Sequence, residues 1–188
     1  MIRGPRDLIV FDWDGTVVDS ILTIARAIQS SARDLGLAVP TDAQARHVIG
    51  LGLNDALRMA VPDLLPSRVD AFVARYRFHF FGRGSADVPF AGIEALLAAL
   101  RTAGLQLAVA TGKSRAGLDR ALAETGLAPY FSATRCADQG HPKPHPWMLA
   151  SLSDELGVGP DRMLMIGDTS HDIEMARAFG AASIGVVY

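Results

Sequence analysis

The chain has 188 residues, of which 49% are apolar. This length and composition allow one well-buried core, alone or with a smaller inserted domain, and exclude a disordered or fibrous chain. Eighteen Lys and Arg residues stand against twenty Asp and Glu residues, for a formal net charge of -2. That balance lacks the basic excess of proteins that grip nucleic acid regardless of its sequence, so a small-molecule partner fits better.

The single cysteine and the apolar runs near the start bear on cellular location. With Cys136 alone, no internal disulfide can form, which is the normal state of a cytosolic protein, and a small buried side chain explains it sufficiently. Near the start, the longest apolar run covers residues 8–11, too short for a signal-peptide core or a membrane span. We expect a cytoplasmic protein with no membrane partner.

The first predicted element is a β-strand at residues 8–11, a continuous apolar run of the kind that is buried on both faces of a sheet. Similar runs recur at residues 105–110, 163–166 and, more weakly, 182–187. Apolar residues at helical spacing lie between them, at residues 93–100 and 146–156. Strands that alternate with helices predict a parallel sheet with helices on both faces.

The segment from residue 21 to 84 interrupts this alternation, because it contains no strand-like run. Four helices are predicted there, the first ending at Gly36, the second starting at Thr41 with a capping box to Gln44, the third starting near Asn54, and the fourth running from Ser67 to before Gly82. Gly82 and Gly84 offer a hinge. The sequence therefore predicts an α/β protein whose core, residues 1–20 and 85–188, is interrupted by an all-helical subdomain, residues 21–84.

Two carboxylates follow the first predicted strand, in the run D-W-D-G-T that starts at Asp12. The carboxyl ends of parallel strands face the crevice where open α/β sheets bind ligands. Gly15 lets the backbone turn, so that Asp12 and Asp14 can reach one substrate. An ordinary turn is the alternative, since Asp and Gly are common in turns.

The second predicted strand ends in Thr111, Gly112, Lys113 and Ser114, just before a helix. A hydroxyl and free amides at a helix start form an anion site, although Thr or Ser in this place is more often a simple cap. The spacing of a nucleotide-binding P-loop is absent.

A lysine held between prolines follows, at Lys143. The prolines stiffen the backbone and limit where this side chain can point, whereas an isolated lysine is usually solvated. His141 and His145 have the i, i+4 spacing of a zinc pair on a helix, but the prolines forbid that helix, so we assign no metal to them.

The strand at residues 163–166 runs into G-D-T-S-H-D, which places Asp168 and Asp172 at another strand end. A helix cap would explain either residue alone. The predicted topology, however, brings all these groups to one crevice: Asp12, Asp14, Thr111, Lys143, Asp168 and Asp172. Coincidental caps have no reason to supply this combination of acids, hydroxyl and lysine.

These four runs stand in the order of the four motifs of the haloacid dehalogenase superfamily, and the chain resembles its phosphoglycolate-phosphatase-like members. The resemblance implies a Rossmann-like core with a helical cap inserted after the first strand, and a chain that continues beyond Tyr188 with a further strand and helix. It also implies a Mg²⁺-dependent phosphatase that acts on a small phosphorylated metabolite.

By this resemblance, Asp12 is the nucleophile that forms an aspartyl-phosphate, and Asp14 is the general acid and base. Mg²⁺ would be bound by the Asp12 and Asp168 side chains and the Asp14 backbone carbonyl, while Asp172 would orient Lys143 or a metal-bound water. Phosphoryl oxygens would be neutralised by Lys143 and positioned by Thr111 and the backbone amides of Trp13, Asp14, Gly112 and Lys113.

Two other functions stay open. A phosphotransferase such as a sugar-phosphate mutase shares this chemistry, and a non-catalytic phosphate-binding regulator would keep the crevice but usually lacks Asp12 or Asp14. In the helical subdomain, Arg46, His47 and the loop at residues 50–54 are candidates for contacting the leaving group, although exposed surface residues are the simpler explanation for each. The sequence does not indicate an oligomeric state.

Overall fold

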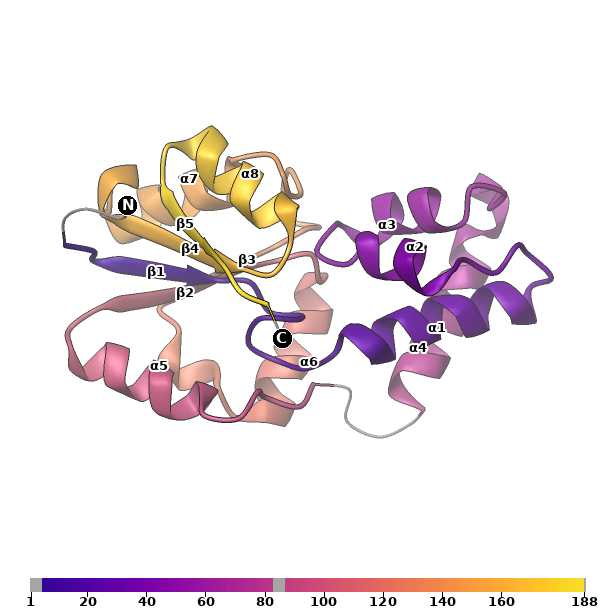
Figure 1. Ribbon diagram of the computed structural model, residues 1–188, viewed down its shortest axis with the longest axis horizontal. Coiled ribbons are helices and arrows are strands. Elements are labelled where there is room, and N and C mark those ends of the chain that lie inside the picture. The colour runs from indigo at the N-terminus through magenta and orange to yellow at the C-terminus, as the bar shows by residue number, and fades with distance from the viewer. Residues whose placement is uncertain (1–4, 83–86, 188) are drawn as a thin grey trace.

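A parallel β-sheet forms the centre of the computed structural model, which describes residues 5–82 and 87–187 (Figure 1). Within those residues five strands lie in the order β3-β2-β1-β4-β5, and every neighbouring pair is parallel. The strands are β1 (Leu8–Phe11), β2 (Gln106–Thr111), β3 (Ala133–Cys136), β4 (Met163–Gly167) and β5 (Ala182–Gly185). The central place of β1 explains why its residues are all apolar and all buried.

Helices cover both faces of the sheet, as the alternating pattern predicts. One face carries α5 (Ile93–Thr102) and α6 (Arg115–Thr125), and the other carries α7 (Trp147–Leu156) and α8 (Ser170–Phe179). Successive residues of β1 point to opposite faces: Ile9 and Phe11 pack with α5 and α6, whereas Leu8 and Val10 pack with α7 and α8. Short 3-10 helices lie at Ala128–Tyr130 and Pro160–Arg162.

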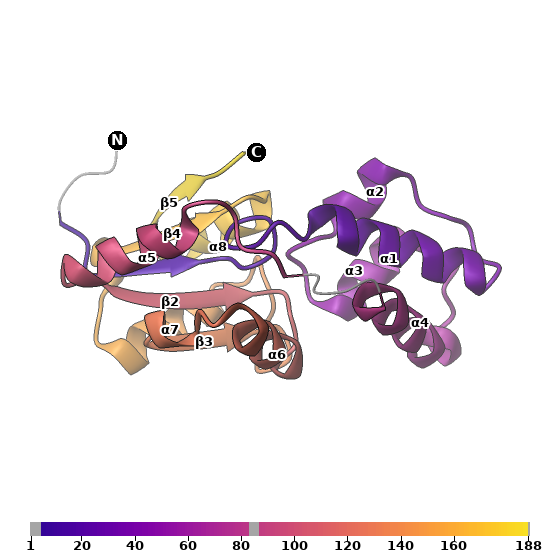
Figure 2. The same cartoon turned by 90° about the horizontal axis from the view of Figure 1, so that it is seen from below.

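In the described residues of the inserted segment, every regular element is a helix. The segment consists of α1 (Ile21–Asp34), α2 (Asp42–His47), α3 (Leu53–Ala60), a 3-10 turn (Pro66–Arg68) and α4 (Val69–Phe81). Its buried apolar side chains, among them Ile28, Leu57 and Phe72, form a separate hydrophobic core. Both views place this helical unit beyond the carboxyl ends of the strands, where the predicted crevice lies (Figure 2).

The chain leaves and re-enters the sheet domain through two adjacent segments. The amide of Asp19 donates to the carbonyl oxygen of Val88 at 2.8 Å, and the amide of Phe90 donates to that of Val17 at 3.1 Å. The outgoing and returning segments are thus joined by backbone hydrogen bonds. The predicted hinge residue Gly84 and the predicted boundary at 84/85 lie outside the described residues, whereas Gly82 ends α4 as expected.

The predicted α/β class, the strands in the described residues and the four inserted helices are confirmed. At the start of α2 the predicted capping box is present, with Gln44 N donating to Thr41 Oγ1 at 3.3 Å and Thr41 N donating to Gln44 Oε1 at 2.9 Å. The edge strand β3 was not predicted, because its A-T-R-C sequence carries two polar residues and no apolar run. Among the described helices, none has the length and apolar character needed to cross a membrane.

Candidate active site

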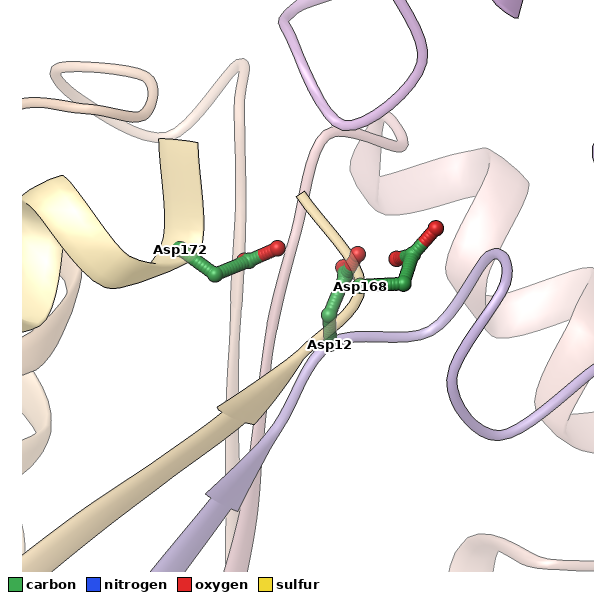
Figure 3. A group of neighbouring side chains, drawn as sticks. All are labelled: Asp12, Asp168 and Asp172. Atoms are coloured by element: carbon green, nitrogen blue, oxygen red, sulfur yellow. The ribbon is translucent and has the colours of Figure 1, made fainter. Parts of the chain in front are cut away.

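Three carboxylates meet where β1 and β4 end (Figure 3). Asp12 follows β1, Asp168 follows β4, and Asp172 lies in the first turn of α8. Because β1 and β4 are hydrogen-bonded neighbours, their ends bring these side chains together, with one oxygen from each within 4.8 Å of the others. The structure thus brings together three of the predicted acidic residues.

The Lys143 ammonium lies between two of these carboxylates. Its Nζ is 2.7 Å from Asp12 Oδ1 and 2.6 Å from Asp172 Oδ1, and all three side chains are essentially inaccessible to solvent. The other Asp172 oxygen accepts hydrogen bonds from Thr169 N at 3.2 Å and Thr169 Oγ1 at 2.8 Å. Both oxygens of Asp172 therefore have a partner, one of them Lys143, and the role of Asp172 in orienting that lysine stays a prediction. His141 and His145 stack on each other with ring centroids 4.4 Å apart and are not part of the acidic group.

The charge of this group is unbalanced, since three carboxylates face one ammonium. Burial raises the pKa of Asp12 well above its usual range, with Lys143 opposing the rise and Asp172 adding to it. Burial and then the charge of Asp172 raise the pKa of Asp168 to about 6. Burial lowers the pKa of Lys143, but the carboxylates of Asp12 and Asp172 raise it more, so the ammonium stays charged.

The donor set fits a hard cation. Asp12 Oδ2 is buried and has no hydrogen-bond partner, which is costly unless a further positive group meets it. Carboxylate oxygens are the ligands that Mg²⁺ prefers, and a divalent ion would offset the surplus negative charge. The residues present therefore suit Mg²⁺ better than zinc, whose structural sites use sulfur and nitrogen ligands.

Glycines allow this close packing of backbone and carboxylate. Gly15 has a φ of 79°, and a Cβ on it would lie 2.3 Å from Asp168 Oδ2. A Cβ on Gly167 would lie 2.3 Å from Asp172 Cγ. A larger residue at Gly15 would displace Asp168, a predicted metal ligand, and one at Gly167 would displace Asp172, the ion-pair partner of Lys143.

The Asp14 carboxylate belongs to a second group of charged side chains, separate from the three carboxylates described above. Asp14 Oδ1 accepts a hydrogen bond from Ser20 Oγ at 2.6 Å and lies 3.0 Å from Lys113 Nζ. The same ammonium lies 3.2 Å from Asp87 Oδ1, which also accepts a hydrogen bond from Trp13 Nε1 at 3.2 Å. We call Lys113, Asp14 and Asp87 the lysine bridge.

Asp87 is the member of this bridge that the sequence did not reveal. It lies on the segment returning from the helical unit, is 5% exposed, and belongs to none of the four motifs. Burial raises its pKa, and Lys113 lowers it in part. For Lys113 the composition of the sequence carried a signal. The chain has two lysines against sixteen arginines, and both lysines form buried ion pairs, so the rarity of lysine pointed to these positions.

The predicted phosphate-binding residues lie at the end of β2. The buried Thr111 Oγ1 accepts a hydrogen bond from the Lys113 amide at 3.2 Å, and Ser114 caps α6 by accepting from Gly117 N at 3.2 Å. Gly112 is covered by the helical unit, because a Cβ there would lie 2.5 Å from the Leu51 carbonyl oxygen. The loop at residues 50–52 is therefore seated on the end of β2.

Two cavities adjoin the site. One, of about 300 Å³, is lined by Asp14 and Lys113 and by the helical unit, including Leu51 and Leu53. The other, of about 410 Å³, lies beside Asp168 and is lined by Arg46 and His47. The predicted leaving-group contacts are thus divided between two places, and the side chain of Asn54 lies outside the described residues.

Comparison with known proteins identifies relatives that match nearly the full length of this chain. A family model described as haloacid dehalogenase-like hydrolase matches residues 9–186. The chain is 37% identical to the protein named "Probable phosphatase IndB" of Dickeya dadantii (strain 3937), over 97% of this chain and 82% of that protein. It is 32% identical to the phosphoglycolate phosphatase of Neisseria meningitidis serogroup A, over 96% of this chain and 80% of that protein.

Another relative carries a different name. The chain is 36% identical to the tyrosine-protein kinase PtkA of Mycobacterium tuberculosis (strain ATCC 25618 / H37Rv), over 95% of this chain but 61% of PtkA. Among solved structures, that of a predicted phosphoglycolate phosphatase from Haemophilus somnus 129pt matches with a TM-score of 0.87 at 27% identity, over 97% of this chain and 86% of that chain.

Replacing Lys143 by Met is expected to destabilise the metal-free protein by about 3–5 kcal/mol, because Asp12 and Asp172 would lose their buried counter-charge. Mg²⁺ should restore part of this loss by supplying positive charge to the same carboxylates. Urea unfolding in EDTA and in Mg²⁺ measures both effects. The exposed Arg26→Met on α1 serves as control and should change stability by less than about 0.5 kcal/mol. Equal stability of Lys143→Met and the parent in EDTA would contradict this account of the ion pair.

Replacing Gly112 by Ala should separate the helical unit from the end of β2, because the added Cβ would collide with the carbonyl oxygens of Gly50 and Leu51. We expect kcat/KM to fall by about tenfold or more while the fold is retained. Gly52→Ala in the same loop is the matched control, since its Cβ would make only an ordinary contact with Ala137 at 3.4 Å. Equal activity of the two variants would show that seating of this loop does not matter.

Proposed function

The chain belongs to the haloacid dehalogenase-like hydrolase family and is a phosphoric monoester hydrolase, and we propose that it hydrolyses a small phosphate monoester with Mg²⁺ through an aspartyl-phosphate on Asp12. The observation that carries this proposal is the buried Asp12, paired with Lys143 and beside two further carboxylates at the strand ends. Phosphoglycolate enters as a candidate substrate through the names of the relatives.

The attack of Asp12 on a phosphate brings like charges together. At about 4 Å and an effective dielectric near 20, each pair of unit charges costs about 4 kcal/mol, so positive charge must be close by. Lys143 supplies one such charge from a position fixed by Asp172. Mg²⁺, held by the side chains of Asp12 and Asp168 and the backbone carbonyl of Asp14, would neutralise further phosphoryl charge.

Covalent attack splits one difficult displacement into two easier steps. The ester oxygen leaves as Asp12 forms its bond to phosphorus, and Asp14 protonates that oxygen. In the second step Asp14 accepts the proton of the water that attacks the aspartyl-phosphate. Ser20 and Lys113 hold the Asp14 carboxylate in place for both steps.

The phosphoryl oxygens need fixed donors as well as charge. Thr111 stands at the end of β2 with its hydroxyl held by the Lys113 amide. We assign the positioning of the phosphoryl group to this hydroxyl and to the backbone amides of Trp13, Asp14 and Gly112, because donors set before the reaction stabilise the charge that develops in it. The amide of Lys113, predicted as a further donor, instead donates to Thr111 Oγ1.

We further propose that residues 21–84 act as a cap over a core made of residues 1–20 and 85–188. A cap seated on Gly112 would exclude water from Asp12 and limit access to small substrates. The cavity of about 300 Å³ beside Asp14 has the size of a small-molecule site. The near-neutral charge offers no general attraction for nucleic acid, and a cytoplasmic location belongs to the same proposal.

Phosphoryl transfer to a second substrate is the main competing function. The similarity to PtkA, which is named a tyrosine-protein kinase, is a reason to test it. A transferase shares the nucleophile but protects its acyl phosphate from water. Measuring phosphate release beside phosphate transfer to added alcohols and sugars separates the two. A non-catalytic regulator is disfavoured because Asp12 and Asp14 are both present.

Replacing Asp12 by Asn should lower kcat by about a thousandfold or more while the fold is retained, since the amide keeps the shape but loses the nucleophilic carboxylate. Phosphate release from a panel of metabolites, with circular dichroism as a check of folding, measures this. Asp154→Asn, at an exposed position on α7, is the control and should retain full activity. Residual activity of Asp12→Asn within about tenfold of the parent would exclude Asp12 as the nucleophile.

Removal of metal by EDTA should abolish turnover, and Mg²⁺ should restore it. Ca²⁺ should restore little, because its larger and looser coordination shell would misplace Asp12 relative to phosphorus. Activity assays after chelation, with each ion added back in turn, measure this order. Undiminished turnover in metal-free buffer would refute the assignment of Mg²⁺.

A further inference from the structure

The cavity beside Asp14 receives the part of the substrate that leaves. Asp14 lines it, and the proposed function gives Asp14 the task of protonating the leaving oxygen. The alcohol must therefore occupy this space when the ester bond breaks. The chemistry of its wall decides which alcohols fit.

Most of that wall is apolar and comes from the helical unit: Ile24, Ile28, Leu51, Leu53, Ala56 and Phe80. Such a surface gains free energy when an apolar group displaces water from it, and gains none from a charged group that loses its own hydration. Tyr76 also lines the cavity, and burial raises the pKa of its hydroxyl, so the phenol is neutral.

Within residues 5–82 and 87–187, the positive groups that line the cavity are already paired or are exposed. Lys113 is bridged to Asp14 and Asp87, so the lysine bridge has no net positive charge whether or not Asp14 carries a proton. Trp13 holds Asp87 in place by its indole N-H. Arg120 pairs with Glu124 at 2.6 Å, and its guanidinium lies 3.8 Å from the centroid of the Phe81 ring.

Arg77, the remaining cation among the described residues of the lining, is exposed, so water and salt screen its charge. A carboxylate on the leaving group would thus meet an apolar wall, with the Lys113 ammonium already paired with Asp14 and Asp87. We propose that this cavity selects phosphate esters of neutral, apolar alcohols, and that Asp87, by pairing with Lys113, keeps that ammonium from binding carboxylated alcohols such as glycolate. The proposal rests on the proposed phosphatase function and narrows its substrate class.

A matched pair of esters tests the selection. Isobutyl phosphate has the branched shape of 2-phosphoglycolate, with two methyl groups in place of the carboxylate oxygens. We expect its kcat/KM to exceed that of 2-phosphoglycolate by about tenfold or more, in the same Mg²⁺ buffer. In a series from ethyl to butyl phosphate, kcat/KM should rise by about three- to fourfold for each methylene that the wall covers.

Two variants locate the selection in the cavity. Asp87→Asn leaves Lys113 with one carboxylate, and should shift the ratio of the two kcat/KM values toward 2-phosphoglycolate by about tenfold. The exposed Asp70→Asn on α4 should leave the ratio unchanged. Leu53→Asn should weaken the dependence on chain length, whereas Leu65→Asn, in the helical unit but outside the cavity lining, should not.

The outcomes of these experiments distinguish a failure of this inference from a failure of the proposed phosphatase function. Turnover that depends on Asp12 and Mg²⁺ but prefers 2-phosphoglycolate over isobutyl phosphate would overturn the inference and leave the phosphatase standing. Absence of Mg²⁺-dependent phosphate release from every ester would overturn both. A preference for isobutyl phosphate that Asp87→Asn reduces is the result that supports the inference.

Discussion

The buried ammonium of Lys143 is the contact on which the geometry of this site depends. An unpaired ammonium or carboxylate in the protein interior costs several kcal/mol, so Asp12, Lys143 and Asp172 can be buried only together. They come from the end of β1, the loop before α7 and the first turn of α8. The requirement to pair these charges therefore fixes three distant segments at one point, and the position of the proposed nucleophile follows from it.

The ion-pair group around Lys143 and the lysine bridge around Lys113 differ in their charge balance, and this difference suits them to different roles. Around Asp12 there are three carboxylates for one ammonium, together with an unsatisfied carboxylate oxygen, so the group is suited to a divalent cation and a phosphate. Around Lys113 there are two carboxylates for one ammonium, and Trp13 and Ser20 donate hydrogen bonds to the same two oxygens that face the ammonium. Neither Asp14 nor Asp87 has a buried side-chain oxygen without a hydrogen-bond partner, so this second group can hold Asp14 beside its cavity without attracting a second anion.

The sequence predicted the elements that have strong local signals. Continuous apolar runs predicted the buried strands, and apolar residues at helical spacing predicted the inserted helices. The motif residues follow strands whose carboxyl ends lie at one edge of the sheet, so their meeting at one site was also predictable. It did not predict β3, whose residues Thr134 and Arg135 are polar and half-buried, so no apolar run marks the strand. Asp87 was missed for a related reason: its role arises from where the returning segment meets Trp13 and Lys113, a contact between residues 74 and 26 positions apart in the chain. Such a contact depends on tertiary packing, which local patterns do not encode.

The helical unit and the core supply different parts of the proposed active site. The acidic group and Lys143 come entirely from the core, whereas the apolar wall of the cavity comes from the helical unit and the lysine bridge is completed by the segment returning from it. Residues of the wall can therefore change without disturbing the charges around Asp12. Function resides in such sites rather than in the fold, so one set of strand-end motifs can serve different acceptors and leaving groups. This separation gives a physical reason why relatives of similar identity to this chain carry names as different as phosphoglycolate phosphatase and tyrosine-protein kinase.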